Sequence, residues 1–219
     1  MTRNELLETA KPVIIPGGTD MIQAILEGRK TVFRKPVMPQ PDEKHQCPLG
    51  FVNDSTEKKD IGSFGFGMDE LGGSIQYARP KYRPGDILYV REVWHTYQKR
   101  VGEGEGCLIG EFYGYKASIA NSEDADEPWN SPSCMPKEAA RIFLRIKDVR
   151  VERLQEITPD QICGEGVEVE YPHILNGEEK ICAFQQLWNS TIRGSDIARY
   201  GWNANPWVFV YEFELVPVG

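Results

Sequence analysis

An alternation of nine residues near the end of the chain constrains the fold most. From Trp207 to Leu215, every second residue is aromatic or large and apolar, and the residues between them are two valines and two glutamates. Side chains of a β-strand point alternately to its two faces, so this spacing predicts a strand with one aromatic face. We expect that face to pack inside the core of a sheet, which is a commoner use of such rings than stacking on a base.

Other segments also have the character of strands. The run from Asp86 to Trp94 follows a Pro-Gly turn and is rich in aliphatic and aromatic residues, and the segment from Cys107 to Ala117 is its expected hairpin partner across the glycine-rich loop 102–106. Between Arg141 and Leu154 the alternation changes face midway, which predicts a bulged or strongly bent strand.

Helix signals accompany the strands. Thr158, Pro159 and Gln161 form a capping-box start, and the helix they begin is expected to end at Gly164 or Gly166, which places Glu165 at a helix end. A second helix is predicted from about Lys180 to Ile192. The sequence is therefore α+β.

A short amphipathic helix is predicted over residues 21–27. Thr19 or Asp20 is expected to cap its start, and Gly28 can take the left-handed conformation that closes a last helical turn. Arg29, Lys30 and Thr31 follow directly, so we expect a charged site at the helix terminus. The alternative is a cation favoured only by the helix dipole.

Composition limits the class of protein. The chain has 219 residues, 40% of them hydrophobic and 26% charged, which suits one sizeable core or two small ones. It has no run of eighteen apolar residues and its first residues are polar, so we expect no membrane association and a cytoplasmic location. Five cysteines at irregular positions fit reduced thiols.

Residues 36–80 form a segment of different composition. This stretch is rich in Gly, Pro, Asp and Lys, and its glycines interrupt any periodic pattern. We expect a long irregular insertion, which is either a lid over a pocket or a plain surface loop.

Net charge argues against a generic nucleic-acid binder. The chain carries −8 at pH 7 with a pI near 5.1, whereas proteins that rely on phosphate contacts normally present a basic face. A local group of basic residues remains, namely Arg29, Lys30, Arg34, Lys35, Lys81 and Arg83. It favours a small or single-stranded ligand over a long duplex.

No metal or cofactor site is predicted. His45 and Cys47 lie close together, but the spacing of the histidines and cysteines fits no standard zinc module. We therefore expect neither a bound metal nor a cofactor, and the sequence leaves the oligomeric state open.

Four segments in order give the chain a family resemblance. They are Gly28-Arg29-Lys30-Thr31, the run Gly85–Glu92, the stretch from Leu154 to Gly166, and the ending Asn205–Phe213. Together they resemble the ASCH domain, and most closely its phage and prophage branch. The resemblance implies a small mixed β-barrel similar to the PUA RNA-binding fold, with flanking short helices and a long loop insertion, as a single domain over residues 1–219.

The resemblance also implies chemistry, position by position. Some small ASCH proteins are amidohydrolases that cleave N4-acetylcytidine with a lysine, a threonine and a glutamate. Lys30 matches the lysine and Glu165 the glutamate, whereas Phe33 stands at the threonine position. Thr31 is a poor substitute, because neighbouring side chains in a strand point to opposite faces. Independently of the family, Lys30 and Glu165 can also be an ordinary salt bridge.

Two functions of different classes follow. The first is a binding module that holds RNA, a nucleobase or a modified nucleoside at the barrel mouth, with Arg29, Thr31, Arg34, Arg91, Glu92 and Trp94 as ligand-binding residues beside Lys30 and Glu165. The second is an amidohydrolase acting on N4-acylated cytidines through Lys30 and Glu165, with a non-standard nucleophile. Phe33 favours the first, because it removes the family's nucleophile.

Overall fold

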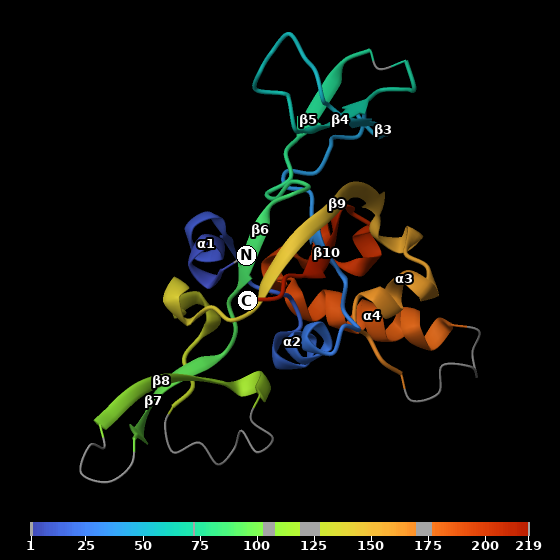
Figure 1. Ribbon diagram of the computed structural model, residues 1–219. Helices are drawn as coiled ribbons and strands as arrows, with labels where there is room; N and C mark the ends of the chain where they lie inside the picture. Colours follow the sequence, from blue (N-terminus) through green and yellow to red (C-terminus); the bar gives the residue numbers. More distant parts are fainter. Residues whose placement is uncertain (1, 72, 103–107, 119–127, 170–176, 219) are drawn as a thin grey trace. The chain divides into compact units, whose positions relative to one another are not determined.

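The computed structural model describes residues 2–71, 73–102, 108–118, 128–169 and 177–218. Over these residues the protein is a mixed α+β structure with ten strands in three sheets and a few short helices (Figure 1). The chain divides into two compact units. Unit 1 contains Met1–Gly28, Ile87–Leu144 and Leu215–Gly219, and unit 2 contains Arg29–Asp86 and Arg145–Glu214.

Unit 1 is built on a short parallel strand pair and a hairpin. Strand β1 (Lys11–Val13) pairs in parallel with β6 (Ile87–Val90), and β7 (Trp94–Val101) pairs in antiparallel with β8 (Leu108–Tyr115). Helices α1 (Arg3–Thr9) and α2 (Gly18–Leu26) complete the unit. Its core includes a cluster of Leu6, Ala10, Tyr89, Met135, Ala139, Ala140, Phe143 and Val216.

The hairpin is present, but its first strand differs from the predicted one. The run from Asp86 to Trp94 is not one strand, because β6 pairs with β1 and a separate strand, β7, begins at Trp94. Strand β8 is the expected partner, and Cys107 and most of the predicted loop 102–106 lie outside the described residues. The short strand Lys11–Val13 that takes β6 as its neighbour has no strong signal in the sequence.

Helix α2 begins earlier than predicted. Gly17 and Gly18 both have left-handed backbone angles, with φ of 94° and 70°, and the helix starts there without a side-chain cap from Thr19 or Asp20. The predicted end is confirmed, since Gly28 has a φ of 75° directly after the last turn.

Unit 2 contains three strands of a sheet in the order β9-β10-β2. Strand β2 (Val32–Pro36) pairs in antiparallel with β10 (Trp207–Leu215), and β9 (Phe143–Arg153) enters from unit 1 along the chain. The predicted last strand is confirmed with its bounds. Phe33 stacks on Tyr211 across the two strands, with ring centroids 4.8 Å apart, so the aromatic face of β10 is a packed core face.

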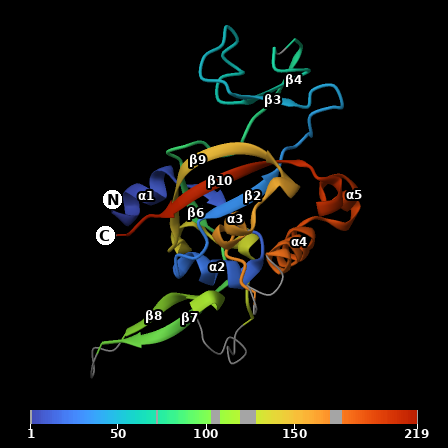
Figure 2. The same ribbon diagram turned by 90° about the vertical axis from the view of Figure 1, so that its right-hand side faces the viewer.

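The opposite face of this sheet is covered by helices (Figure 2). Helices α3 (Pro159–Gly164) and α4 (Glu178–Thr191) contribute Ile162, Phe184 and Trp188 to a cluster with two valines of β10. Helix α5 (Ile197–Tyr200) precedes β10. Short 3-10 helices lie at Lys116–Ser118, Pro132–Cys134, Lys137–Ala139, Leu154–Glu156, Gly194–Asp196 and Trp202–Ala204.

The segment 36–80 is more regular than expected. It contains an antiparallel sheet of β3 (Cys47–Phe51), β4 (Phe64–Gly67) and β5 (Ile75–Ala78), with a register irregularity between Pro48 and Gly50. The expectation of an irregular insertion is therefore wrong for these strands. The rings of Phe64 and Phe66 supply the physical reason, since they are buried and pack against β10 residues Phe209 and Trp207.

The strand pairings of the described residues do not close into a barrel. The PUA-like barrel and the single domain over 1–219 therefore stay predictions. In the described part of the chain, no helix is both long and apolar enough to span a membrane.

Candidate functional site

Two residues far apart in the sequence meet in unit 2. Lys30 and Glu165 form an isolated antiparallel backbone bridge, and the backbone N–H of Thr31 donates to the carbonyl of Gly164 at 2.8 Å. The Lys30 ammonium donates to a Glu165 carboxylate oxygen and to the Glu165 backbone carbonyl, both at 2.7 Å. Each of the two residues is 3% exposed. The expected contact between them is thus present, and it is buried.

The start of α3 fixes where Glu165 lies. Thr158 accepts from the N–H of Gln161, the Gln161 side chain accepts from the N–H of Thr158, and Pro159 occupies the first turn. This is the predicted capping box, and it sets both the entry of the helix and, six residues later, its end at Gly164. Glu165 is the C-cap residue, so its backbone is held by the last helical turn while its carboxylate faces inward.

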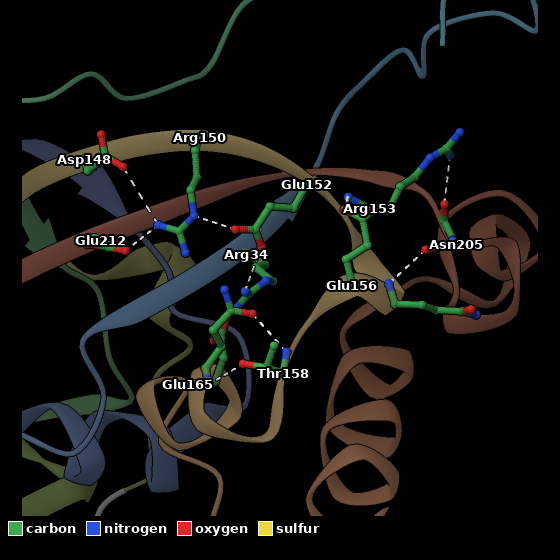
Figure 3. A network of polar contacts seen from close by, with 12 residues as sticks. Arg34, Asp148, Arg150, Glu152, Arg153, Glu156, Thr158, Glu165, Asn205 and Glu212 are labelled. Atoms are coloured by element: carbon green, nitrogen blue, oxygen red, sulfur yellow. Dashed lines mark hydrogen bonds and ion pairs between the residues drawn. The ribbon is translucent and has the colours of Figure 1, made fainter. Parts of the chain in front are cut away.

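Arg34 completes the buried part of the site (Figure 3). On β2 it is the cross-strand partner of Val210, and its guanidinium donates to the second carboxylate oxygen of Glu165 at 2.7 Å and to Glu152 at 3.1 Å. Arg34 is 3% exposed. Each carboxylate oxygen of Glu165 therefore accepts a hydrogen bond from one cationic side chain.

Ion pairs continue from this point toward solvent. Glu152 on β9 bonds to Arg150, which also pairs with Glu212 on β10 and lies 3.8 Å from Asp148 (Figure 3). Side-chain exposure rises along the series, from 4% for Glu165 to 18% for Glu152 and 42% for Glu212. We call the residues Lys30, Arg34, Glu165, Glu152, Arg150 and Glu212 the ion cluster.

The interior of the ion cluster holds more positive than negative charge. Lys30 and Arg34 share the single buried carboxylate of Glu165, and the second negative charge comes from the partly exposed Glu152. The Nε of Arg34 is buried and finds no hydrogen-bond partner among the residues that the structure describes. Buried ion pairs are weak contributors to stability because desolvation offsets their attraction, and an unsatisfied buried donor adds a further cost. A buried cluster of charges with an unsatisfied donor is therefore a candidate for function.

The geometry bears on the two chemistries that the sequence left open. The Lys30 nitrogen donates two hydrogen bonds, one to the Glu165 carboxylate and one to the Glu165 backbone carbonyl. Among the described residues, no hydroxyl group bonds to Lys30 or Glu165. Phe33 is fully buried and packs on the aromatic face of β2, opposite Arg34. A threonine hydroxyl at that position would lie on the wrong face of the strand for this cluster.

Arg29 and Thr31 flank the buried residues and reach solvent. Arg29 is half-buried and contacts Glu168 at 3.3 Å and the carbonyl of Gly166 at 3.4 Å. Thr31 is exposed. Arg29 and Thr31 are the two chain neighbours of Lys30, and we call these two side chains the rim of the ion cluster.

The remaining predicted site residues belong to unit 1. Glu92 is 2% exposed and makes a two-bond contact with Arg141, both bonds at 2.8 Å. Arg91 donates to the carbonyl of Ser133 at 3.3 Å, and Trp94 packs edge-on against Tyr113. A common site of these residues with the ion cluster stays a prediction.

Sequence reasoning missed Glu152, Arg150, Glu212 and Arg141. A signal for the first three was available. Arg150 and Glu152 are two residues apart in β9 and so share a face, and Glu212 breaks the apolar run of β10. Charges at such spacing in interior strands indicate an ion network in the sheet.

Comparisons with protein-family models, with curated proteins and with solved structures gave no match. In the parts of the chain that the structure describes, no group of three or more His, Cys, Asp or Glu side chains is placed to hold a metal ion.

Proposed function

We propose that this protein is an ASCH-type module that binds RNA, a nucleobase or a modified nucleoside at the ion cluster of unit 2. The observation that carries the proposal is the buried contact of Lys30, Glu165 and Arg34, because Lys30 and Glu165 are the two positions that match the family's polar site. The finer fold, a PUA-like barrel, is part of the same proposal.

The accessible contacts come from the rim of the cluster. Arg29 presents a planar guanidinium, and Thr31 presents a hydroxyl that can donate or accept. Beneath them, Lys30 and Glu165 hold the two backbone segments together at Thr31 and Gly164. A nucleobase edge carries both donors and acceptors, and an aromatic ring stacks well on a guanidinium. The polar groups of this rim therefore suit a single base or an unpaired segment better than a duplex.

The second candidate function is hydrolysis of N4-acylated cytidines. It keeps Lys30 and Glu165 and requires a water molecule or another hydroxyl as the nucleophile. The match of both residues to the family pattern favours it, whereas the buried Phe33 at the threonine position favours binding alone.

One experiment tests both functions. The native protein is titrated with cytidine, N4-acetylcytidine and a short single-stranded RNA, and the N4-acylated cytidines are followed by chromatography for release of the acyl group. The variants Arg29→Gln and Thr31→Val change the rim without disturbing the buried ion pairs. Lys59→Gln, at a lysine whose side chain is 76% exposed elsewhere in unit 2, is the control.

Binding that falls about tenfold in the rim variants and not in the control supports the proposed site. Turnover that disappears in Lys30→Ala, provided that this variant keeps its circular dichroism spectrum, assigns the hydrolase function. Absence of both binding and turnover in the native protein overturns the proposal.

A further inference from the structure

A second group of cations lies on the opposite face of β2. Lys35 follows Arg34 and so points to the aromatic side of the strand, where its ammonium lies 5.8 Å from the ring centre of Phe33 and 5.9 Å from that of Tyr82. The ammonium of Lys81 lies over the same Tyr82 ring at 5.3 Å. Two lysines thus share one aromatic ring.

In the described part of the chain, no acidic side chain is paired with either lysine. Among the described residues, no ion pair involves Lys35 or Lys81, and their ammonium groups lie over aromatic rings. Lys35 is half-buried. Burial, together with the charge of Lys81, lowers the pKa of Lys35 to about 8. The fold therefore holds two like charges close together over aromatic rings, with no anionic side chain paired to either among the described residues.

The aromatic rings beneath the two lysines pack on a third ring, that of Tyr211. Tyr211 stacks on Phe33 and meets Tyr82 edge-on with ring centres 5.5 Å apart, and its hydroxyl accepts the backbone N–H of Lys81 at 3.1 Å. Burial raises the pKa of Tyr82, and it raises the pKa of Tyr211 to about 12. Both hydroxyls are thus uncharged at pH 7. Asp86 acts electrostatically on Tyr82, and its carboxylate accepts the backbone N–H of Arg83 at 2.9 Å.

We propose that Lys35 and Lys81 form a binding site for a phosphate monoester dianion, with the Tyr82 ring as its floor. A dianion balances two ammonium groups, and its oxygens accept the several donors that two ammonium groups present. Lys35 is half-buried against the rings of Phe33 and Tyr82, and this partial burial strengthens the attraction at its ammonium. Free phosphate and the terminal phosphate of a nucleotide carry this chemistry alike.

This site is separate from the ion cluster. Lys35 and Arg34 are adjacent in β2 and their side chains lie on opposite faces of the strand. The proposal therefore stands whether or not the ion cluster binds a nucleobase.

The test uses the full chain with lysines labelled at the ε-carbon, and inorganic phosphate, a nucleoside 5′-monophosphate and a dinucleoside phosphodiester as probes. Phosphate is expected to shift the Lys35 and Lys81 resonances and to raise the midpoint of the Lys35 titration from about 8. Lys35→Met and Lys81→Met are each expected to weaken phosphate binding by about tenfold or more. Lys59→Met, at an exposed lysine, is the matched control.

The pH dependence gives a second readout. Affinity is expected to fall above about pH 8, as Lys35 loses its proton, and below about pH 6, as the monoester gains one. Phosphate binding that is equal in Lys35→Met and in the native protein overturns the proposal, and so does the absence of any shift at Lys35. Equal affinity for the phosphodiester overturns the assignment to a monoester. Tighter binding of the nucleotide than of free phosphate supports the site and indicates that the bound phosphate group is that of a nucleotide.

Discussion

Replacing Glu165 by glutamine tests the energetics of the ion cluster most directly. The substitution keeps the shape of the side chain and removes its charge, so Lys30 and Arg34 lose the anion that they share. Lys30 retains its bond to the backbone carbonyl of residue 165, and Arg34 retains Glu152. The loss is therefore confined to the two charge-assisted bonds at the carboxylate.

The magnitude follows from those two bonds. A hydrogen bond to a charged group contributes about 1.5–3 kcal/mol, and removing one partner of a buried ion pair costs about 3–5 kcal/mol. Because the amide oxygen of glutamine still accepts one bond, we expect Glu165→Gln to lower the free energy of unfolding by about 3–5 kcal/mol. The urea midpoint then falls by roughly 1–3 M.

Glu212→Gln is the matched control, since it is the same chemical change at the exposed end of the same network. The Glu212 side chain is 42% exposed, so we expect a loss below about 1 kcal/mol. Urea denaturation followed by circular dichroism measures both variants. If Glu165→Gln costs no more than Glu212→Gln, the buried cluster contributes no specific stability and the reasoning is refuted.

Three further substitutions are expected to have definite effects. Lys35→Met should stabilise the protein at pH 7 by about 1–2 kcal/mol after allowance for solvent screening. The pKa of Lys35 is about 8 in the folded protein and its usual value is 10.5, so the unfolded chain binds more protons between these values and the stability of the native protein rises with pH there. In thermal melts between pH 7 and 10, the stability difference between Lys35→Met and the native protein should therefore shrink. A difference that stays constant over this range would contradict the assignment. Thr158→Ala removes the N-cap of α3 and should cost about 1 kcal/mol in urea unfolding, whereas Thr158→Ser, which keeps the hydroxyl, should cost much less. Gly114→Ala places a methyl group 2.1 Å from the His95 ring, so it should destabilise the hairpin by about 1–3 kcal/mol. The measurement is amide hydrogen exchange, which should become faster in β7 and β8. Unchanged exchange would show that the ring moves freely.

Local chemistry in the sequence was sufficient for several elements. The capping box of α3 and the last strand were predicted because each depends on residues that are neighbours in the chain, such as Thr158 with Gln161. The left-handed Gly28 was predicted for the same reason. The early start of α2 was missed because Gly17 and Gly18 begin the helix by backbone geometry alone, without a side-chain signal.

Long-range pairing could not be predicted in the same way. Strand β6 was extended too far because its neighbour β1 has three residues and no periodic pattern. Lys30 and Glu165 were singled out through the family resemblance, since nothing local in the sequence brings them together. Glu152 and Arg150 were missed because their role depends on which strands lie side by side. Two charged residues that are two positions apart predict an ion pair across strands only when the neighbouring strand is known.

The contact between Lys30 and Glu165 also means that burial of the Lys30 ammonium reports whether unit 2 is folded. The two residues are 135 positions apart along the chain, so the ammonium becomes buried only after a long loop has closed and α3 has reached the sheet. An amine reagent reaches Lys30 only when unit 2 opens, and the rate of that labelling reports how often it does so. A change anywhere in unit 2 that releases α3 would therefore raise the labelling rate of the Lys30 amine before the rest of the strand pairing is lost.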